Sequence, residues 1–329
     1  MSRTEQSVTA VALTKLDEVA APAGVVAIAP DSKTWATAGV LGVHVFAGAA
    51  PVSSAPDTID SASTAVFSPD GALLRVAGRE YRVATGAPTD VRAPADLAPW
   101  AKAQGLPAPP VIRIARSAQS ADGALIVATG VGAAGTGREA AQQAPATGDA
   151  AWLFAFDGAW KPIAAMQHGP EAGYERIAVG AKSIALTGNK WLAVFARDAL
   201  TARHELVGFQ APYLVAWGPG DARLAATHAQ QVAVWRGGAW DAPATTFSIG
   251  DGAPSAIAFD PARALLAIGT LQGHVRIYGV ADAQLAAPPL LVDQAVGAMV
   301  QGLAFAPSGD WLAVSTAAKA LRFKVSASP

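Results

Sequence analysis

One outline returns seven times along this chain: an apolar run, a turn, a second apolar run, and an alternating run that ends in an aromatic residue. The segment AIAFDPARALLAIGTLQGHVRIYGV, residues 256–280, returns near the C-terminus as GLAFAPSGDWLAVSTAAKALRFKV, residues 302–325. The two segments share this outline but few identical residues. A pattern of apolar runs and turns that recurs although few residues are identical indicates a repeated structural unit.

The turn after the first apolar run locates each copy. It falls at Pro30, Pro69, Ala121, Ala181, Pro219, Pro261 and Pro307. Successive turns are 39, 52, 60, 38, 42 and 46 residues apart. Apart from the two long spacings, these values match the roughly 40–45 residues of a four-stranded propeller blade. The residues predicted to end the third run are aromatic in six of the seven copies: Phe46, Ala84, Phe156, Phe195, Trp235, Tyr278 and Phe323.

These copies resemble the WD-repeat (WD40-like) family, with degenerate repeats of the bacterial type. STAVFSPDGALLRVAG (63–78) and SAIAFDPARALLAIGTLQGHVRIYGV (255–280) look like its inner strands. The Trp-Asp ending of the family survives as Phe156-Asp157 and as the Trp of Trp235-Arg236. TLQGHV (270–275) lacks the Asp that contributes to the His–Ser/Thr–Trp–Asp network of the family. The resemblance covers nearly the whole chain and implies an all-β, seven-bladed β-propeller of four-stranded antiparallel blades.

The two ends of the chain predict how the ring closes. The last copy stops after its third strand, LRFKV (321–325), and SVTAVALTKLDEV (7–19) precedes the first complete copy. We expect residues 7–19 to be the outer strand of the seventh blade, because this placement removes two open sheet edges. The chain is then one propeller domain, residues 1–329, with blades starting near residues 23, 62, 111, 173, 211, 253 and 298.

Composition restricts the environment and the partners. The chain is 52% hydrophobic and 15% charged, which allows a large core. A formal net charge of −1 gives no electrostatic reason to expect nucleic acid or an anionic membrane as partner. The uncharged segment 34–56 is interrupted by glycines and prolines, so we predict buried strands around a Gly turn instead of a membrane span. The N-terminal sequence lacks the basic start and long apolar stretch of a secretory signal, so a cytoplasmic protein is expected. Separately, we expect the propeller to be monomeric.

The two long spacings mark insertions. They contain APADLAPWAKAQGLPAPP (93–110), between blades two and three, and VGAAGTGREAAQQAPATGDA (131–150), inside blade three. Because strand direction alternates within a blade, both insertions are expected to emerge on the same face. Segment 93–110, with one helical turn expected at DLAPWAKA, is either a structural cap or a partner contact. Segment 131–150 is either a mobile hairpin tip or a contact loop. The candidate partner-binding residues are Trp100, Lys102, Arg138 and Glu139.

The sequence predicts no catalytic, metal-binding or cofactor-binding residues. The absence of Cys excludes thiolate chemistry, and the five His residues form neither an HxH nor an HExxH pattern. A site shared by His228 and His274 is an open but weaker alternative. Asp31, Asp70 and Asp122 recur in the turn after the first strand, where Asp accepts backbone hydrogen bonds.

The predicted function is therefore a non-catalytic scaffold of WD-repeat type that presents loops to a protein partner or to another subunit of a complex. A propeller enzyme, such as a hydrolase or a lactonase-like protein, remains the alternative, because propeller folds serve both purposes. An enzyme should bring several Asp, Glu or His side chains within reach of one point in the central channel.

Overall fold

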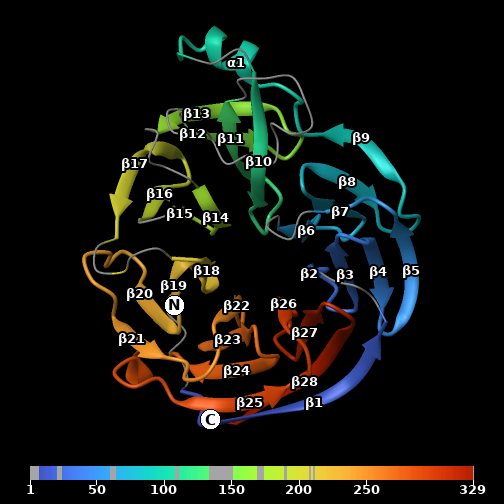
Figure 1. The fold of residues 1–329 in the computed structure, drawn as a ribbon, viewed down its shortest axis with the longest axis vertical. Helices are drawn as coiled ribbons and strands as arrows, with labels where there is room; N and C mark the ends of the chain where they lie inside the picture. The colour runs from blue at the N-terminus through green and yellow to red at the C-terminus, as the bar shows by residue number, and fades with distance from the viewer. Residues whose placement is uncertain are drawn as a thin grey trace.

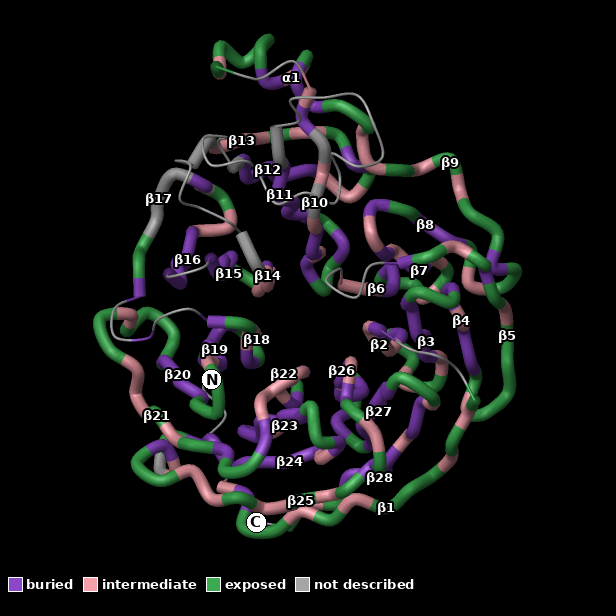
Figure 2. Tube along the Cα trace, in the orientation of Figure 1, coloured by how far each residue is buried: buried purple, intermediate pink, exposed green. Residues whose placement is uncertain are grey.

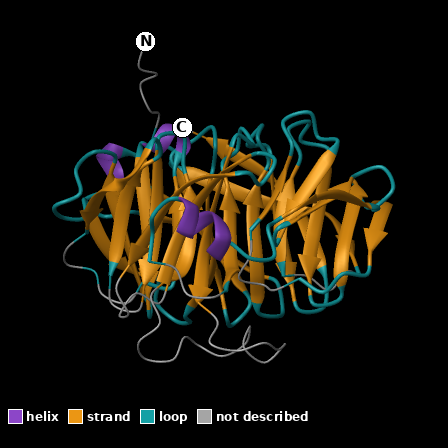
Figure 3. Ribbon diagram, turned by 90° about the horizontal axis from the view of Figure 1, so that it is seen from above, coloured by secondary structure: helices purple, strands orange, loops and turns teal. Residues whose placement is uncertain are grey.

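Seven four-stranded antiparallel sheets are arranged in a ring, as the repeats predicted (Figure 1). The computed structural model describes residues 7–20, 24–59, 64–107, 111–132, 151–168, 174–188, 191–206, 209 and 212–328. Within blades one to six the strands follow chain order, so the first strand lies next to the central axis and the fourth lies on the rim. Seen from the side, the ring is a thick disc whose strands run between two faces that carry the turns (Figure 3).

The strands of the first four blades are as follows. Blade one contains β2 (Val25–Ile28), β3 (Thr34–Gly39), β4 (Gly42–Ala47) and β5 (Ala50–Ala55). Blade two contains β6 (Ala65–Phe67), β7 (Leu73–Val76), β8 (Arg79–Arg82) and β9 (Pro88–Arg92). Blade three contains β10 (Ile112–Gln119), β11 (Leu125–Gly132), β12 (Ala151–Asp157) and β13 (Pro162–His168). Blade four contains β14 (Tyr174–Val179), β15 (Ser183–Gly188), β16 (Leu192–Ala196) and β17 (Ala199–Glu205).

The other three blades complete the ring. Blade five contains β18 (Leu214–Trp217), β19 (Arg223–His228), β20 (Gln231–Arg236) and β21 (Thr245–Ser248). Blade six contains β22 (Pro254–Phe259), β23 (Leu265–Thr270), β24 (His274–Gly279) and β25 (Leu290–Ala295). Blade seven contains β26 (Val300–Phe305), β27 (Trp311–Thr316), β28 (Ala320–Ser328) and β1 (Ala10–Val19). The helical elements among the described residues are α1 (Ala98–Ala103), which confirms the helical turn expected there, and the short 3₁₀ turns η2 (Pro219–Asp221) and η3 (Asp282–Gln284).

The N-terminal strand closes the ring, as predicted for residues 7–19. β1 pairs antiparallel with β28 from Ala10↔Ser328 to Val19↔Ala320. Val11 and Leu13 on β1 pack against the apolar cluster beneath blade seven. The first and last strands of the chain therefore satisfy each other's backbone groups, and β28 is not left as an open edge.

All seven predicted first turns separate the first and second strands of a blade. The recurrent Asp residues brace these turns. Asp31 accepts hydrogen bonds from the N–H groups of Lys33 at 2.8 Å and Thr34 at 2.9 Å. Asp70 and Asp122 each accept one from the Ala two residues later at 3.0 Å, which confirms the structural interpretation of these carboxylates.

An aromatic residue on the third strand is paired with the same position of the second strand in every blade. The seven pairs are Trp35↔Phe46, Leu74↔Tyr81, Ile126↔Phe156, Ile184↔Phe195, Leu224↔Trp235, Leu266↔Tyr278 and Leu312↔Phe323. The sequence assignment of this position in blade two to Ala84 was wrong, because Tyr81 occupies it and Ala84 lies in the following turn. β7 and β8 of blade two have four residues each, whereas β3 and β4 of blade one have six each, so the aromatic residue of blade two follows the first turn at a shorter interval.

The hydrophobic core is divided into layers between neighbouring blades instead of filling the middle of the ring (Figure 2). Between blades four and five, for example, Leu192, Leu224 and Trp235 belong to one buried cluster. Trp235 shows how far the blades depart from the WD-repeat pattern. Its indole Nε1 and the Thr227 hydroxyl are both buried and make no hydrogen bond within the part of the chain described here. Within the described residues, Trp235 therefore contributes to blade five through packing and not through a hydrogen bond of its indole.

Candidate functional site

The two faces of the ring differ in the side chains that they expose. We call one the link face: it carries the turns between second and third strands (40–41, 77–78, 229–230, 271–273 and 317–319) and the links between blades. The large apolar side chains that are exposed on it are Val40, Leu41, Tyr213, Leu271 and Met299. Those exposed elsewhere lie on the outer strands: Leu16, Val52, Ile163 and Leu290. Among the described residues, no large apolar side chain is exposed in the turns of the opposite face, although Ile163 and Leu290 lie at the ends of their strands that adjoin it.

The exposed apolar residues of the link face lie on consecutive blades, from blade five through blades six and seven to blade one. The turn 271–273 is joined by backbone hydrogen bonds to both neighbouring links, from Leu271 N–H to the Ala253 carbonyl at 3.0 Å and from Val296 N–H to the Gly273 carbonyl at 2.8 Å. Tyr213 stacks on His228, with ring centroids 5.9 Å apart and planes 9° apart. We call these exposed apolar residues the arc; within it, contacts with neighbouring segments hold the turn 271–273 and the Tyr213 ring in place.

Several charged groups near the link face are already paired. Arg79 donates to Asp57 at the link into blade two. On blade six, Asp293 lies 2.7 Å from the Nδ1 atom of His274 and 3.1 Å from the Nε atom of Arg276. Asp57 and Asp293 are therefore already engaged by neighbouring cationic groups close to the exposed apolar side chains.

The opposite face uses its polar groups to hold the blades together. A hydrogen bond that involves at least one side chain crosses each of the seven blade interfaces on this side of the ring. In order from the interface of blades one and two, the partners are Ser53 and Val83, Arg75 and Gly123, Arg197 and Asp122, Asp221 and Ala181, Arg223 and Asp282, Arg263 and Gly309, and Trp311 and Ser32. Polar groups of this face thus join every pair of neighbouring blades.

The structure places Trp100 and Lys102 on α1, which lies outside the ring beside blade three (Figures 1 and 3). Trp100 is half-buried, with its ring centroid 6.2 Å from that of Phe154, and Lys102 is exposed. The other two candidate residues, Arg138 and Glu139, lie outside the described residues. Neither of the two described candidates, Trp100 and Lys102, lies on the arc of exposed apolar residues.

The first part of the 93–110 insertion is packed on blade three. Asp96 accepts hydrogen bonds from the N–H groups of Ala98 at 2.9 Å and Ile112 at 2.8 Å. Leu97, Ala98 and Ala101 are buried in a cluster that also contains Phe154 and Ile112. These contacts are those of a structural cap, which was one of the two interpretations of this segment.

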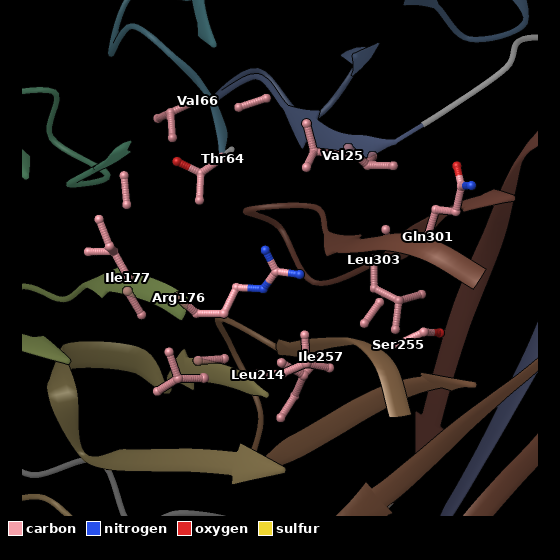
Figure 4. Close-up of a pocket in the computed structure, with 18 of the residues that line it drawn as sticks. Val25, Thr64, Val66, Arg176, Ile177, Leu214, Ser255, Ile257, Gln301 and Leu303 are labelled. Atoms are coloured by element: carbon pink, nitrogen blue, oxygen red, sulfur yellow. The ribbon is translucent and has the colours of Figure 1, made fainter. Parts of the chain in front are cut away.

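The central channel contains a cavity of about 510 Å³ that is lined by the first strands of all seven blades (Figure 4). Most lining side chains are apolar, and Arg176 extends from β14 into the middle of the space. The polar lining residues are Thr64, Gln119, Arg176, Ser255 and Gln301. Among the described residues that line the channel there is no Asp, Glu or His, the residue types that a propeller enzyme was expected to bring together there.

No group of three or more His, Asp or Glu side chains in the described ranges is arranged to hold a metal ion. His228 stacks on Tyr213, and His274 contacts Asp293, so each of these two histidines has its own partner. None of the helices in the described ranges has both the length and the apolar character needed to cross a membrane.

Sequence reasoning missed the exposed apolar residues of the link face. Val40 and Leu41 lie between Gly39 and Gly42 in an apolar segment, and the pattern of that segment predicted only a turn. A two-residue turn between buried strands projects its side chains into solvent, so an apolar pair at such a turn was the available signal. Comparison with known proteins adds no assignment: no model of a protein family matches the chain, and neither does any curated protein.

Proposed function

We propose that this β-propeller is a non-catalytic scaffold that binds a protein partner through the link face. The observation that carries the proposal is the separation of side chains between the two faces. The link face exposes large apolar side chains, each between 38% and 66% exposed: Val40, Leu41, Tyr213, Leu271 and Met299. On the opposite face, polar side chains form hydrogen bonds that join neighbouring blades. An exposed apolar surface of this kind is typical of a protein interaction site.

The partner is expected to supply apolar side chains. Most of the energy of a protein interface comes from a few aromatic and aliphatic anchors that become fully buried. Tyr213, held flat against His228, is an aromatic anchor of this type, and Leu271 with Met299 offers a flexible aliphatic surface. Since Asp57 is already paired with Arg79, an added ion pair there would first have to break an existing one.

Two further points favour a scaffold over an enzyme. The WD-repeat family, which the copies resemble, serves mainly in protein assembly. The described lining of the central channel also lacks the carboxylates and histidines that general acid–base catalysis requires. The proposal extends to a monomeric, cytoplasmic propeller that does not bind nucleic acid, supported by the net charge of −1.

Affinity capture from the native cell with paired variants tests the proposal. The first variant carries Val40→Glu and Leu41→Glu on the link face; the matched control carries Val52→Glu and Leu290→Glu on the outer strands β5 and β25. Both pairs replace exposed apolar residues, so both proteins should melt close to the wild type. We expect the link-face variant to lose the main co-purifying protein and the control to retain it. Equal retention by two folded variants would contradict the link face as the binding surface.

A further inference from the structure

We propose that the central channel is a binding site for a small aliphatic carboxylate, with its carboxylate on Arg176 and its hydrocarbon chain along the apolar channel wall. This inference does not require the scaffold function, because it rests on Arg176 and the first strands; Met299 is shared, since it borders both the channel and the link face. It rests on three features of the described channel lining: its one charged side chain, its apolar walls and the irregular strand pairing beside it.

Arg176 supplies the recognition of an anion. It is the only charged side chain among the described residues that line the cavity, and its guanidinium group extends into the middle of the space (Figure 4). The N–H of Arg176 donates to the Thr187 hydroxyl at 3.0 Å, which fixes the backbone from which the side chain departs. A guanidinium group has five N–H donors in a planar fork that matches a carboxylate, so it can hold one beside its other contacts.

The walls suit a hydrocarbon chain. Apolar side chains surround the space into which Arg176 extends (Figure 4): Val25, Val66, Leu214, Ile257 and Leu303. They come from five different blades, so apolar surface faces the space from several sides. The volume of about 510 Å³ lies within the usual range of about 300–1,000 Å³ for small-molecule sites.

The backbone of the channel wall is also irregular where polar side chains reach it. The ladder between the first and second strands shifts register at Tyr174/Arg176, Pro254/Ala256 and Val300/Gly302. Bulges of this kind redirect side chains and are common beside functional sites.

Isothermal titration with octanoate at neutral pH tests the site, with octan-1-ol and octylammonium as probes of the same chain length. We expect octanoate to bind with one molecule per chain, and the alcohol and the cation to bind at least about tenfold more weakly, a difference of about 1.4 kcal/mol. Arg176→Gln should weaken octanoate binding by about tenfold or more, and Arg176→Lys should weaken it less. Arg92→Gln, at an exposed position on β9, is the matched control and should bind as the wild type does.

Three results would overturn the proposal: no heat of binding at millimolar octanoate, equal binding of octan-1-ol, or unchanged affinity in a folded Arg176→Gln variant. The melting temperature of each variant shows whether it is folded. If Arg176→Gln does not fold, the comparison of octanoate with octan-1-ol on the wild-type protein decides, because only a site that recognises the carboxylate distinguishes them.

Discussion

Arg197 of blade four donates a hydrogen bond to each carboxylate oxygen of Asp122 in blade three, both at 2.9 Å. Asp122 also accepts from the Ser120 hydroxyl and the Ala124 N–H, so one carboxylate both shapes its own turn and joins two blades. Arg197 lies at the turn between β16 and β17 and therefore reaches across the interface from its edge. The pair illustrates how polar side chains of the opposite face are engaged in joining neighbouring blades.

Replacing Arg197 with Ala should destabilise the propeller only modestly. The Asp122 side chain is 55% exposed, and exposed ion pairs contribute about 0.2–1 kcal/mol because solvent screens them. We therefore expect a loss of roughly that size in urea unfolding, and no change in Arg92→Ala. A double-mutant cycle with Asp122→Ala isolates the pair, and a coupling energy of zero would show that the contact adds nothing to stability.

The contribution of this pair should depend on pH. Burial by itself raises the pKa of Asp122, but hydrogen bonds from Ser120, Ala124 and Arg197 outweigh that effect and lower the pKa below its ordinary value of 3.8. A lowered pKa means that the stabilisation is present above the ordinary carboxyl range and is lost as the pH falls through the folded-state pKa. The difference in melting temperature between the wild type and Arg197→Ala should be constant near neutral pH and shrink below about pH 4.

A buried carboxylate in blade five should matter more. Asp221 accepts hydrogen bonds at 2.7 Å from the N–H groups of both Ala181 and Lys182 in blade four, and it is only 8% exposed. Asp221→Ala leaves both donors without this partner, so we expect a loss of about 1–3 kcal/mol or more in the free energy of unfolding. Asp221→Asn, which keeps an acceptor oxygen, should lose less, and Asp90→Ala on the exposed strand β9 should change little. Equal stability of the Asp221→Ala and Asp90→Ala proteins would refute the bridging role.

Removal of residues 1–19 should damage the whole ring. The deletion takes away β1, exposes the edge of β28, and uncovers the apolar residues against which Val11 and Leu13 pack. We expect aggregation by light scattering, or a large fall in melting temperature. A truncated protein that stays monomeric and melts like the full-length chain would refute a stabilising role for this strand.

Chelation should leave stability unchanged. The chain has no Cys, and its described His, Asp and Glu residues form no group of three that could hold a metal. We expect the melting temperature to be the same with and without excess EDTA. A stoichiometric zinc or calcium ion in purified protein, detected by elemental analysis, would contradict this expectation and the scaffold proposal with it.

The fold was predictable from the sequence because local rules determine it. Pro30, Pro69 and Pro307 mark tight turns, and the spacing between turns leaves room for four strands in each blade. The error at Ala84 arose because a constant interval to the aromatic residue was assumed. The interval depends on the lengths of the second and third strands, and β7 and β8 of blade two have four residues each, whereas β3 and β4 of blade one have six each.

The candidate site was less predictable, because it depends on relations between blades. Trp100 was chosen as an aromatic residue in a long insertion, but its packing on Phe154 depends on how that insertion folds back on blade three. Leu271 lies in the turn between β23 and β24, and Met299 lies in the link between β25 and β26. The two residues belong to one arc only because strand direction alternates within a blade, which brings this turn and this link to the same face. The position of Arg176 in the channel likewise depends on the irregular pairing of β14 with β15, which composition does not reveal.

The most direct test of the scaffold proposal is amide hydrogen exchange of the protein with and without its captured partner. We predict slower exchange in the complex at residues 40–41, 271–273 and 297–299 of the link face. We predict no change at the first turns of the opposite face, such as residues 30–33 and 121–124. Protection confined to the opposite face, or to the outer strands, would contradict the assignment of the link face as the binding surface.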